Sequence, residues 1–303
     1  MTATLGVDLG GTGTRVVVLD ASGQVVRQAS VPTAVGEPGR AVEDLLATLT
    51  GIARGHDVSA AGIGASGPIT ASGIIDNRAT LPAYTGVDLG RAVRQQAGWA
   101  CVIDNDAAAA AMGEYTYGAG RGSRSCVTVT LGTGIGVAVI TAGKLARAGD
   151  GTHPEGGHLA VRDAPVPCYC GLPRCWEQAA SRTALEGLVG GDPAAAAAAA
   201  RAGDTRAARS FERYGQQVAA GLGTLLTLFR PDRVVLGGSA AQYLDLFAGP
   251  LTAALDRRPP FQWTPPIVAA GLGDLAGAVG AAVLARSADR RAVDRPGANP
   301  PVR

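Results

Sequence analysis

The side chains best suited to binding a metal ion are concentrated between Glu155 and Glu177. They are one imidazole and three thiols, from His158, Cys168, Cys170 and Cys175. Four such ligands can close a tetrahedral zinc site of the Cys3His type. A set of inert cysteines beside a surface histidine is the weaker interpretation, because tight cysteine clusters in an intracellular chain usually bind metal or take part in catalysis. We therefore expect a zinc-pinned loop that holds His158 and the two flanking carboxylates toward a polar substrate.

A second candidate site follows the apolar run at residues 101–103, where three polar residues stand in a row before an alanine-rich helix. They are Asp104, Asn105 and Asp106. A carboxylate between the end of a strand and the start of a helix lies where α/β enzymes place their chemistry. Capping of the helix by Asp106 would explain one polar residue but not three in succession.

Two glycine–threonine turns, LGGTGT at residues 9–14 and LGTGIG at residues 131–136, each join two apolar strands. Backbone amides in such turns can approach a phosphate closely, because glycine lacks a side chain. The candidate nucleotide-binding residues in the two turns are Gly10, Gly11, Thr12, Thr133 and Gly134. Asp8 ends the first strand and could hold a magnesium ion, usually through water.

We interpret the repeated turn as a diverged duplication in which each half contributes one phosphate-binding hairpin. The pair would clamp a nucleotide in the cleft between two domains. In the second half, the strand expected at residues 233–236 runs into Gly237 and Gly238, and this pair could let an adenine ring lie flat against the backbone.

Two familiar nucleotide motifs are excluded. Gly62, Gly64 and Gly67 form a GxGxxG, but Pro68 and a second turn follow where a Rossmann fold needs a helix. Lys144 is the only lysine, and its surroundings do not match a Walker A loop.

Hydrophobic periodicity predicts strands and helices that mix along the whole chain, and so an α/β fold. Expected strands cover residues 5–8, 15–19, 25–31, 58–65, 101–103, 127–130, 137–141, 233–236 and 267–270. Expected helices cover residues 39–54, 107–114, 182–189, 193–201, 205–229, 240–256 and 275–286. The proline-containing end from residue 287 on is expected to be disordered.

The chain has 303 residues, enough for two domains with sizeable cores. Its net charge of +2 and its 17% of charged residues give no reason to expect a nucleic-acid partner. Neither a signal peptide nor an apolar run of transmembrane length is present. We therefore expect a soluble, cytoplasmic protein that has no membrane partner.

Taken together, the motifs resemble those of the ROK family (repressor, open reading frame, kinase), which belongs with the sugar-kinase, actin and heat-shock ATPases. The resemblance runs from about Leu5 to Arg286. It rests on DLGGTGTR at residues 8–15, NDAAAAAMGE at 105–114, TLGTGIG at 130–136, EGGH at 155–158, CYCGLPRCWE at 168–177 and VLGGS at 235–239. The single motifs are weak, but their order and spacing are specific.

This resemblance implies a two-domain, actin-like ATPase (ribonuclease H-like) fold with an interdomain cleft. Residues 1–114, with the closing helix 275–286, would form the N-terminal domain, residues 115–274 the C-terminal domain with the zinc loop, and residues 287–303 a disordered tail. Asp106 would be the catalytic base. The sugar-binding residues would be Asn105, Glu155, His158, Glu177 and Gly67. The implied ligands are ATP with Mg²⁺, a structural Zn²⁺ and a small sugar, and the implied assembly is a homo-oligomer, a dimer or tetramer.

The expected activity is phosphorylation of a hexose at its six-position hydroxyl, most like that of a glucokinase. Two departures from the family pattern are Arg174 in place of a glycine and Thr80 in place of a sugar-binding asparagine, with Asn77 nearby. The second departure bears on which sugar is used. The alternatives are an N-acetylmannosamine or other N-acetylhexosamine kinase and a sugar sensor without turnover. For the kinase reaction, the sequence leaves open whether ATP or polyphosphate is the phosphoryl donor. A family repressor would carry a helix-turn-helix domain ahead of this fold, and the first strand at Leu5 leaves no room for one.

Overall fold

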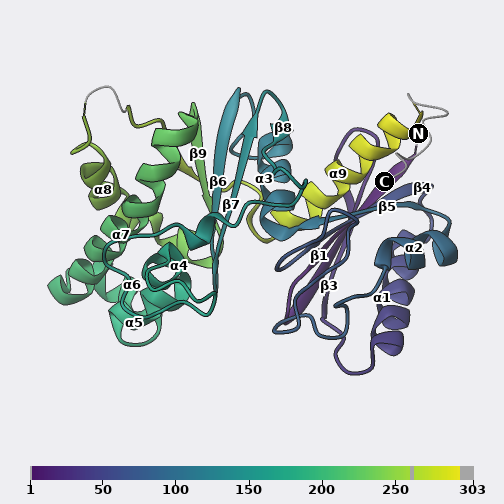
Figure 1. Cartoon of the computed structure of the whole chain (residues 1–303), viewed down its shortest axis with the longest axis horizontal. Helices are drawn as coiled ribbons and strands as arrows, with labels where there is room; N and C mark the ends of the chain where they lie inside the picture. Colours follow the sequence, from purple (N-terminus) through teal and green to yellow (C-terminus); the bar gives the residue numbers. More distant parts are fainter. Residues whose placement is uncertain (1, 260–262, 294–303) are drawn as a thin grey trace. The chain divides into compact units, whose positions relative to one another are not determined.

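The structure is a computed structural model that describes residues 2–259 and 263–293. The chain forms two compact units, each with its own mixed β-sheet (Figure 1). Of the described residues, unit 1 comprises those up to Tyr117, the segment Arg147–His153 and those from Leu275 to Val293. Unit 2 comprises those within Gly118–Ala146 and Pro154–Asp274. The chain therefore returns briefly to unit 1, at Arg147–His153, before it completes unit 2.

The sheet of unit 1 has the strand order β3-β2-β1-β4-β5. Its strands are β1 (Ala3–Leu9), β2 (Gly13–Leu19), β3 (Val25–Pro32), β4 (Val58–Ala65) and β5 (Ala100–Asn105). β1 pairs antiparallel with β2 and parallel with β4, and β4 pairs parallel with β5. The helices of this unit are α1 (Pro38–Ala53), α2 (Leu89–Ala97), α3 (Asp106–Tyr117) and α9 (Ala276–Val293).

The two faces of this sheet are packed differently. Because side chains alternate along a strand, Leu5 and Val7 of β1 face one way, into a core shared with α1 and α2. Gly6 faces the other way, against α9, and a Cβ at Gly6 would overlap the carbonyl oxygen of Ala278. This side of β1 therefore accepts α9 only because its central residue has no side chain.

The sheet of unit 2 repeats the topology of the first, with the order β10-β9-β6-β7-β8. Its strands are β6 (Ser125–Leu131), β7 (Ile135–Thr141), β8 (Lys144–Leu145), β9 (Arg233–Gly237) and β10 (Ile267–Ala269). β6 pairs antiparallel with β7 and parallel with β9, as β1 does with β2 and β4. The matching strand order agrees with the duplication inferred from the two glycine–threonine turns.

The helices of unit 2 are α4 (Trp176–Ala180), α5 (Arg182–Val189), α6 (Pro193–Arg201), α7 (Thr205–Phe229) and α8 (Leu244–Leu255). Three of them begin after capping side chains: Ser181 accepts from Ala184, Asp192 from Ala194 and Ala195, and Asp204 from Ala207. Such caps satisfy amides that have no partner within the helix. The ranges of α5, α6 and α7 agree with those expected from the sequence.

Several expectations need correction. The helix expected at residues 240–256 divides into a 3₁₀ turn, Ser239–Tyr243, followed by α8. The last helix continues to Val293, so residues 287–293 are helical and not part of a disordered tail. The remainder of that predicted tail, residues 294–303, lies outside the described residues. The sequence analysis also missed α2, α4 and β8. Among the helices that the structure describes, none combines the length and apolar character needed to cross a membrane.

Candidate active site

In unit 1, Asn105 fixes the turn between β5 and α3. Its side-chain oxygen accepts hydrogen bonds from the backbone N–H groups of Ala107 (2.8 Å) and Ala108 (3.2 Å), which caps the helix. Its Nδ2 donates to the carbonyl oxygen of Gly67 at 3.1 Å. Gly67 has a φ of +90°, and a Cβ there would lie 2.5 Å from Nδ2 of Asn77. Asn105 and Gly67, both expected at the substrate site, are therefore in contact.

The two carboxylates beside Asn105 have different surroundings. Asp104 is buried and forms a bidentate ion pair with Arg147, with Nη1 donating to Oδ1 at 2.8 Å and Nη2 to Oδ2. Asp106 is half-buried at the first residue of α3, where its Oδ1 accepts from the N–H of Ala107 at 2.8 Å. Asp104 is thus held by a guanidinium that stays protonated, and its carboxylate serves the structure of the turn.

Hairpin 1, residues 10–13 between β1 and β2, presents backbone at its tip. Gly10 N–H donates to the carbonyl oxygen of Gly13 at 3.1 Å, and the Thr12 side chain is exposed. Thr33 stabilises this tip, since its hydroxyl donates to the carbonyl oxygen of Gly10 at 2.6 Å and lies 3.0 Å from the hydroxyl of Thr14. An exposed turn of this kind can offer amides and a hydroxyl to a phosphate.

Asp8 lies at the end of β1, directly before hairpin 1. One of its oxygens is 3.7 Å from a guanidinium nitrogen of Arg15. The first turn of α9 passes close by, so that a Cβ on Gly277 would lie 2.8 Å from the carboxyl carbon of Asp8. A single carboxylate beside a phosphate-binding turn suits Mg²⁺, which keeps several waters and takes its other ligands from substrate phosphates.

A series of contacts and hydrogen bonds runs from hairpin 1 to the Asn105 turn within unit 1. Thr80 lies against Gly11, where a Cβ would be 3.0 Å from the Thr80 Cβ. Asn77 donates to the Thr80 hydroxyl at 2.5 Å and to the carbonyl oxygen of Ser66 at 2.9 Å. Ser66 precedes Gly67, which holds Asn105. Thr80, the residue that departs from the family pattern, thus lies between the expected nucleotide and sugar residues.

Hairpin 2, residues 132–134 between β6 and β7, is the counterpart in unit 2. Gly132 N–H donates to the carbonyl oxygen of Gly134 at 3.0 Å, and Thr133 is exposed at the tip. Gly238, with a φ of +79°, lies against the backbone of Leu131, the last residue of β6. Gly237 is buried inside β9, so Gly238 is the more accessible of this pair.

The four expected metal ligands converge in unit 2. Their ligand atoms all lie within 4.8 Å of one another. Nδ1 of His158 is 3.5 Å from Sγ of Cys168, and Sγ of Cys170 is 3.5 Å from Sγ of Cys175. Ligand atoms around a tetrahedral zinc ion with Zn–S bonds of about 2.3 Å would be about 3.7 Å apart. The donor set and its spacing therefore fit one Zn²⁺ ion.

Short backbone pairings bring these ligands together. Ala160 and Cys175 form an antiparallel bridge, and Trp176 N–H donates to the carbonyl oxygen of Leu159 at 2.8 Å. Trp176 is fully buried, and its indole N–H donates to the carbonyl oxygen of Gln217 on α7 at 3.0 Å. The residues around His158 are thereby held against the start of α4.

The three expected sugar-binding side chains of unit 2 surround this loop. Desolvation by neighbouring atoms raises the pKa of Glu155; the His158 side chain opposes this shift and the Glu177 carboxylate adds to it. Glu177 is buried, and its Oε2 accepts from the N–H of Ile135 at 3.0 Å. Nε2 of His158, the nitrogen that does not face Cys168, lies 3.5 Å from the hydroxyl of Tyr169.

Sequence analysis missed three contributors to these sites. Arg147 holds Asp104, Thr33 locks hairpin 1, and Tyr169 packs edge-on against His158 with ring centroids 5.5 Å apart. Tyr169 is 81% exposed, and its place between two expected zinc ligands was the only signal that could have identified it. Arg147 and Thr33 lie outside every motif, so nothing in the sequence marked them.

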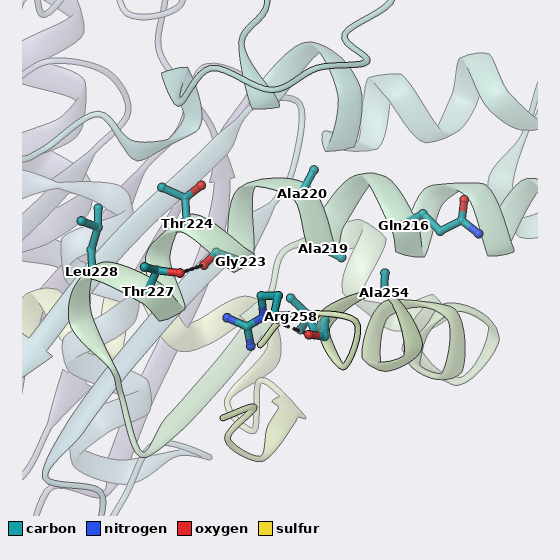
Figure 2. A pocket seen from close by; sticks show the side chains of 10 residues that line it. Gln216, Ala219, Ala220, Gly223, Thr224, Thr227, Leu228, Ala254 and Arg258 are labelled. Atoms are coloured by element: carbon teal, nitrogen blue, oxygen red, sulfur yellow. Dashed lines mark hydrogen bonds between the residues drawn. The ribbon is translucent and has the colours of Figure 1, made fainter. Parts of the chain in front are cut away.

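A pocket of about 450 Å³ in unit 2 lies between α7 and the end of α8 and is lined by none of the predicted site residues (Figure 2). Its walls include Ala220, Gly223, Thr227 and Arg258. Thr227 uses its hydroxyl within its own helix, donating to the carbonyl oxygen of Gly223 at 2.8 Å. The described residues that line the pocket include no carboxylate and no metal ligand, so its size alone does not make it an active site.

The sequence pattern of the ROK family matches residues 4–288, and the chain belongs to this family. A glucokinase from Streptomyces coelicolor is 34% identical, covering 95% of this chain and 99% of its own length. An N-acetyl-D-glucosamine kinase from Pectobacterium atrosepticum is 31% identical, covering 92% and 97%. The crystal structure of a ROK family glucokinase from Streptomyces griseus, in complex with glucose and AMPPNP, has a TM-score of 0.78 at 34% identity, covering 94% of this chain and 99% of that one. This likeness confirms the expected α/β fold of the actin-like ATPase type.

Proposed function

We propose that the protein is an ATP-dependent hexose kinase of the glucokinase type, which transfers the γ-phosphoryl group to the six-position hydroxyl of the sugar. The observation that carries this proposal is the pair of equivalent hairpins together with the Asn105–Asp106 turn. Phosphoryl transfer depends mostly on positioning the substrates and stabilising their charge, and the hairpins and the turn can provide both. The similarity to glucokinases over almost the whole chain supports the same activity.

In the proposed reaction, Asp106 accepts the proton of the six-position hydroxyl as that oxygen attacks the γ-phosphorus. The new O–P bond forms while the bond to the β-phosphate oxygen breaks, which releases ADP. The amides of the two hairpins, with the hydroxyls of Thr12 and Thr133, bind the phosphates. Asp8 would hold Mg²⁺, which supplies positive charge to the phosphate oxygens.

The proposal assigns Asn105, Glu155, His158 and Glu177 to the sugar hydroxyls, with Gly67 holding Asn105 in place. Zn²⁺ takes no part in the chemistry, because four protein ligands leave no open coordination position. Its role is to hold the loop that carries His158. When Nδ1 is on the metal, Nε2 keeps its hydrogen and can donate to a sugar oxygen.

An assay that measures ADP release with each sugar of a panel tests this function. The panel contains glucose, mannose, N-acetylglucosamine and N-acetylmannosamine, with ATP or polyphosphate as donor. We expect sugar-dependent ADP release that is fastest with glucose. An N-acetylhexosamine kinase is the second candidate, because one of the similar proteins is an N-acetyl-D-glucosamine kinase. Faster turnover of an N-acetylated sugar would favour it, and no turnover with any sugar would contradict both.

The substrates of the proposed enzyme are small molecules. We infer that the enzyme is a homo-oligomer, a dimer or tetramer, and that it is located in the cytoplasm. Light scattering of the purified protein gives the mass of the assembly. A mass equal to one chain of 30.3 kDa would contradict the inferred oligomer.

A further inference from the structure

Glu177 closely follows the metal loop, by which we mean residues 158–175 with the four expected zinc ligands, and its side chain contacts hairpin 2. Its Oε2 accepts from the Ile135 N–H at 3.0 Å, and only 9% of the residue is exposed. Gly134 lies so close that a Cβ there would overlap this same oxygen. A carboxylate that accepts a backbone N–H away from water makes a strong hydrogen bond. The Glu177 side chain is therefore part of the framework of hairpin 2.

Two further hydrogen bonds join the same region to hairpin 2. The backbone N–H of Arg182 donates to the carbonyl oxygen of Gly132 at 2.7 Å. The hydroxyl of Thr183 donates to the backbone carbonyl oxygen of Thr133 at 3.3 Å. We call Glu177, Arg182 and Thr183 the α4–α5 corner. It supports hairpin 2 at its start, at its tip and at the first residue of β7.

The α4–α5 corner is also attached directly to the metal loop. Glu177 lies two residues after the expected zinc ligand Cys175. Between them, Trp176 is fully buried and donates from its backbone to Leu159, the neighbour of His158. A shift of the loop that carries His158 is therefore transmitted to the corner, because a close-packed interior does not absorb it.

We propose that the α4–α5 corner couples the sugar-binding loop to the nucleotide-binding hairpin 2, with Glu177 acting as a positioning residue in addition to its proposed contact with the sugar. A sugar that binds the loop fixes the corner and thereby orders hairpin 2 for the nucleotide. Thermodynamic linkage requires the reverse effect to have the same size. This inference rests on the proposed function, since it needs both ligands to bind.

The position of Arg182 allows a clean test. It is the first residue of α5, where proline is well tolerated, and Ser181 before it has the extended conformation that proline requires (φ −69°, ψ 170°). Arg182→Pro removes the N–H that holds Gly132 and places ring carbon against its carbonyl oxygen. Arg182→Ala is the matched control, because it keeps the N–H and removes only the side chain. Neither change replaces a residue assigned to sugar or phosphate.

Isothermal titration calorimetry with AMPPNP and Mg²⁺, without and with saturating glucose, measures the coupling. For the wild-type protein and Arg182→Ala we expect glucose to tighten AMPPNP binding by about fivefold or more, within the usual range for coupled sites. For Arg182→Pro we expect AMPPNP binding without glucose to weaken by roughly 5- to 50-fold, as for a lost buried hydrogen bond. The effect of glucose should fall toward onefold, while glucose binding alone stays within about twofold.

Glu177→Gln provides a second variant that keeps the shape and an acceptor oxygen while removing the charge. A residue that only contacts the sugar would leave sugar-free AMPPNP binding unchanged, whereas we expect this variant to weaken it several-fold. If the wild-type protein binds both ligands and neither Arg182→Pro nor Glu177→Gln alters AMPPNP binding or its response to glucose, the coupling is wrong and the proposed function stands. If the wild-type protein binds neither ligand, both the proposed function and the coupling are contradicted.

Discussion

The guanidinium of Arg147 holds both carboxylate oxygens of Asp104, one residue before Asn105. The same Asp104 Oδ1 that receives Arg147 also accepts from the backbone N–H of Asn105 at 2.8 Å. The side chains of Arg147 and Asp104 are 29% and 12% exposed. The pair therefore fixes the backbone that carries the amide proposed to bind the sugar and the proposed base. Arg147 does so from the short segment in which the chain returns to unit 1.

Arg147→Lys should lower turnover more than it changes substrate affinity. Lysine keeps the charge but cannot reproduce two parallel hydrogen bonds. We expect kcat to fall roughly 5- to 50-fold, because a small displacement of a catalytic group is costly. The KM values for sugar and ATP should change by less than about threefold. Steady-state kinetics with both substrates varied measures the two effects.

Arg201→Lys is the matched control for this prediction. Arg201 also forms a bidentate pair, with both hydrogen bonds to Asp245 at 2.9 Å, but these side chains are 49% and 54% exposed and lie outside the proposed site. Exposed pairs contribute little, so kcat should be unchanged. Equal kcat values in Arg147→Lys, Arg201→Lys and the wild-type protein would show that Arg147 does not position the base.

Gly277→Ala should impair the use of MgATP without affecting the sugar. A methyl group at this position of α9 would lie 2.8 Å from the carboxyl carbon of Asp8, so the carboxylate must move. If Asp8 serves Mg²⁺, the KM for MgATP should rise about tenfold, equivalent to roughly 1.4 kcal/mol of binding free energy. The dissociation constant for glucose, measured by calorimetry, should stay the same.

Gly51→Ala, within α1, is the corresponding control because no described atom beyond its own stretch of helix lies within 4 Å of the added Cβ. It should leave kinetics unchanged and raise the free energy of unfolding by about 0.5–1 kcal/mol, since alanine favours a helix more than glycine does. If Gly277→Ala had unaltered MgATP kinetics and an intact fold by circular dichroism, the assignment of Asp8 to the nucleotide site would be wrong.

Purified wild-type protein should contain one Zn²⁺ per chain by elemental analysis. Cys170→Ser should lose metal and activity together while circular dichroism stays near that of the wild-type protein, because each unit has its own hydrophobic core. The activity loss would be indirect, through a loosened loop that no longer aims Glu155, His158 and Glu177 at the sugar. Zinc-free protein with full activity would refute this role.

Thiol reactivity gives an independent measure of the metal site. Cys170 is exposed, and a backbone hydrogen bond at Leu172 lowers its thiol pKa, so in chelator-treated protein it should react first with iodoacetamide near neutral pH. Burial raises the pKa of Cys101 to about 12, so this thiol should stay unreactive until the pH approaches that value or the protein unfolds. Added Zn²⁺ should protect Cys170, and equal alkylation rates with and without Zn²⁺ would contradict its role as a ligand.

Asp106→Asn keeps the shape of the side chain and removes the base. We expect kcat to fall by roughly 10²- to 10⁴-fold, the usual contribution of general base catalysis, while glucose binding by calorimetry is largely kept. Turnover close to that of the wild-type protein would exclude Asp106 as the base.

Those parts of the fold that depend on local signals were predictable. Hydrophobic periodicity predicted the ranges of α5, α6 and α7, and the repeated glycine–threonine turns indicated a duplicated topology. In contrast, α2 was missed because it is only nine residues long and has few large apolar residues, although Leu89, Ala92 and Val93 have helical spacing. The prolines at positions 296, 300 and 301 led us to expect disorder from residue 287 on, although α9 continues to Val293.

The chemistry of the candidate site was predictable from residue types, but its connections were not. Cysteine and histidine spacing predicted the four ligands that now lie within 4.8 Å of one another. The pairing of Arg147 with Asp104 and of Glu177 with Ile135 joins residues 43 and 42 positions apart, and no local pattern encodes such contacts. Only the folded chain shows that Asp104 is held in an ion pair with Arg147.

The central claim is that this chain transfers the γ-phosphoryl group of ATP to a hexose. Phosphorus NMR of a reaction with glucose, ATP and Mg²⁺ tests it most directly, because it identifies both products at once. The account predicts that the γ-phosphate signal of ATP is replaced by the ADP signals and by one phosphomonoester signal that couples to the protons of carbon six. If ATP stayed intact with every hexose tested, or were hydrolysed to inorganic phosphate alone, the account would be wrong.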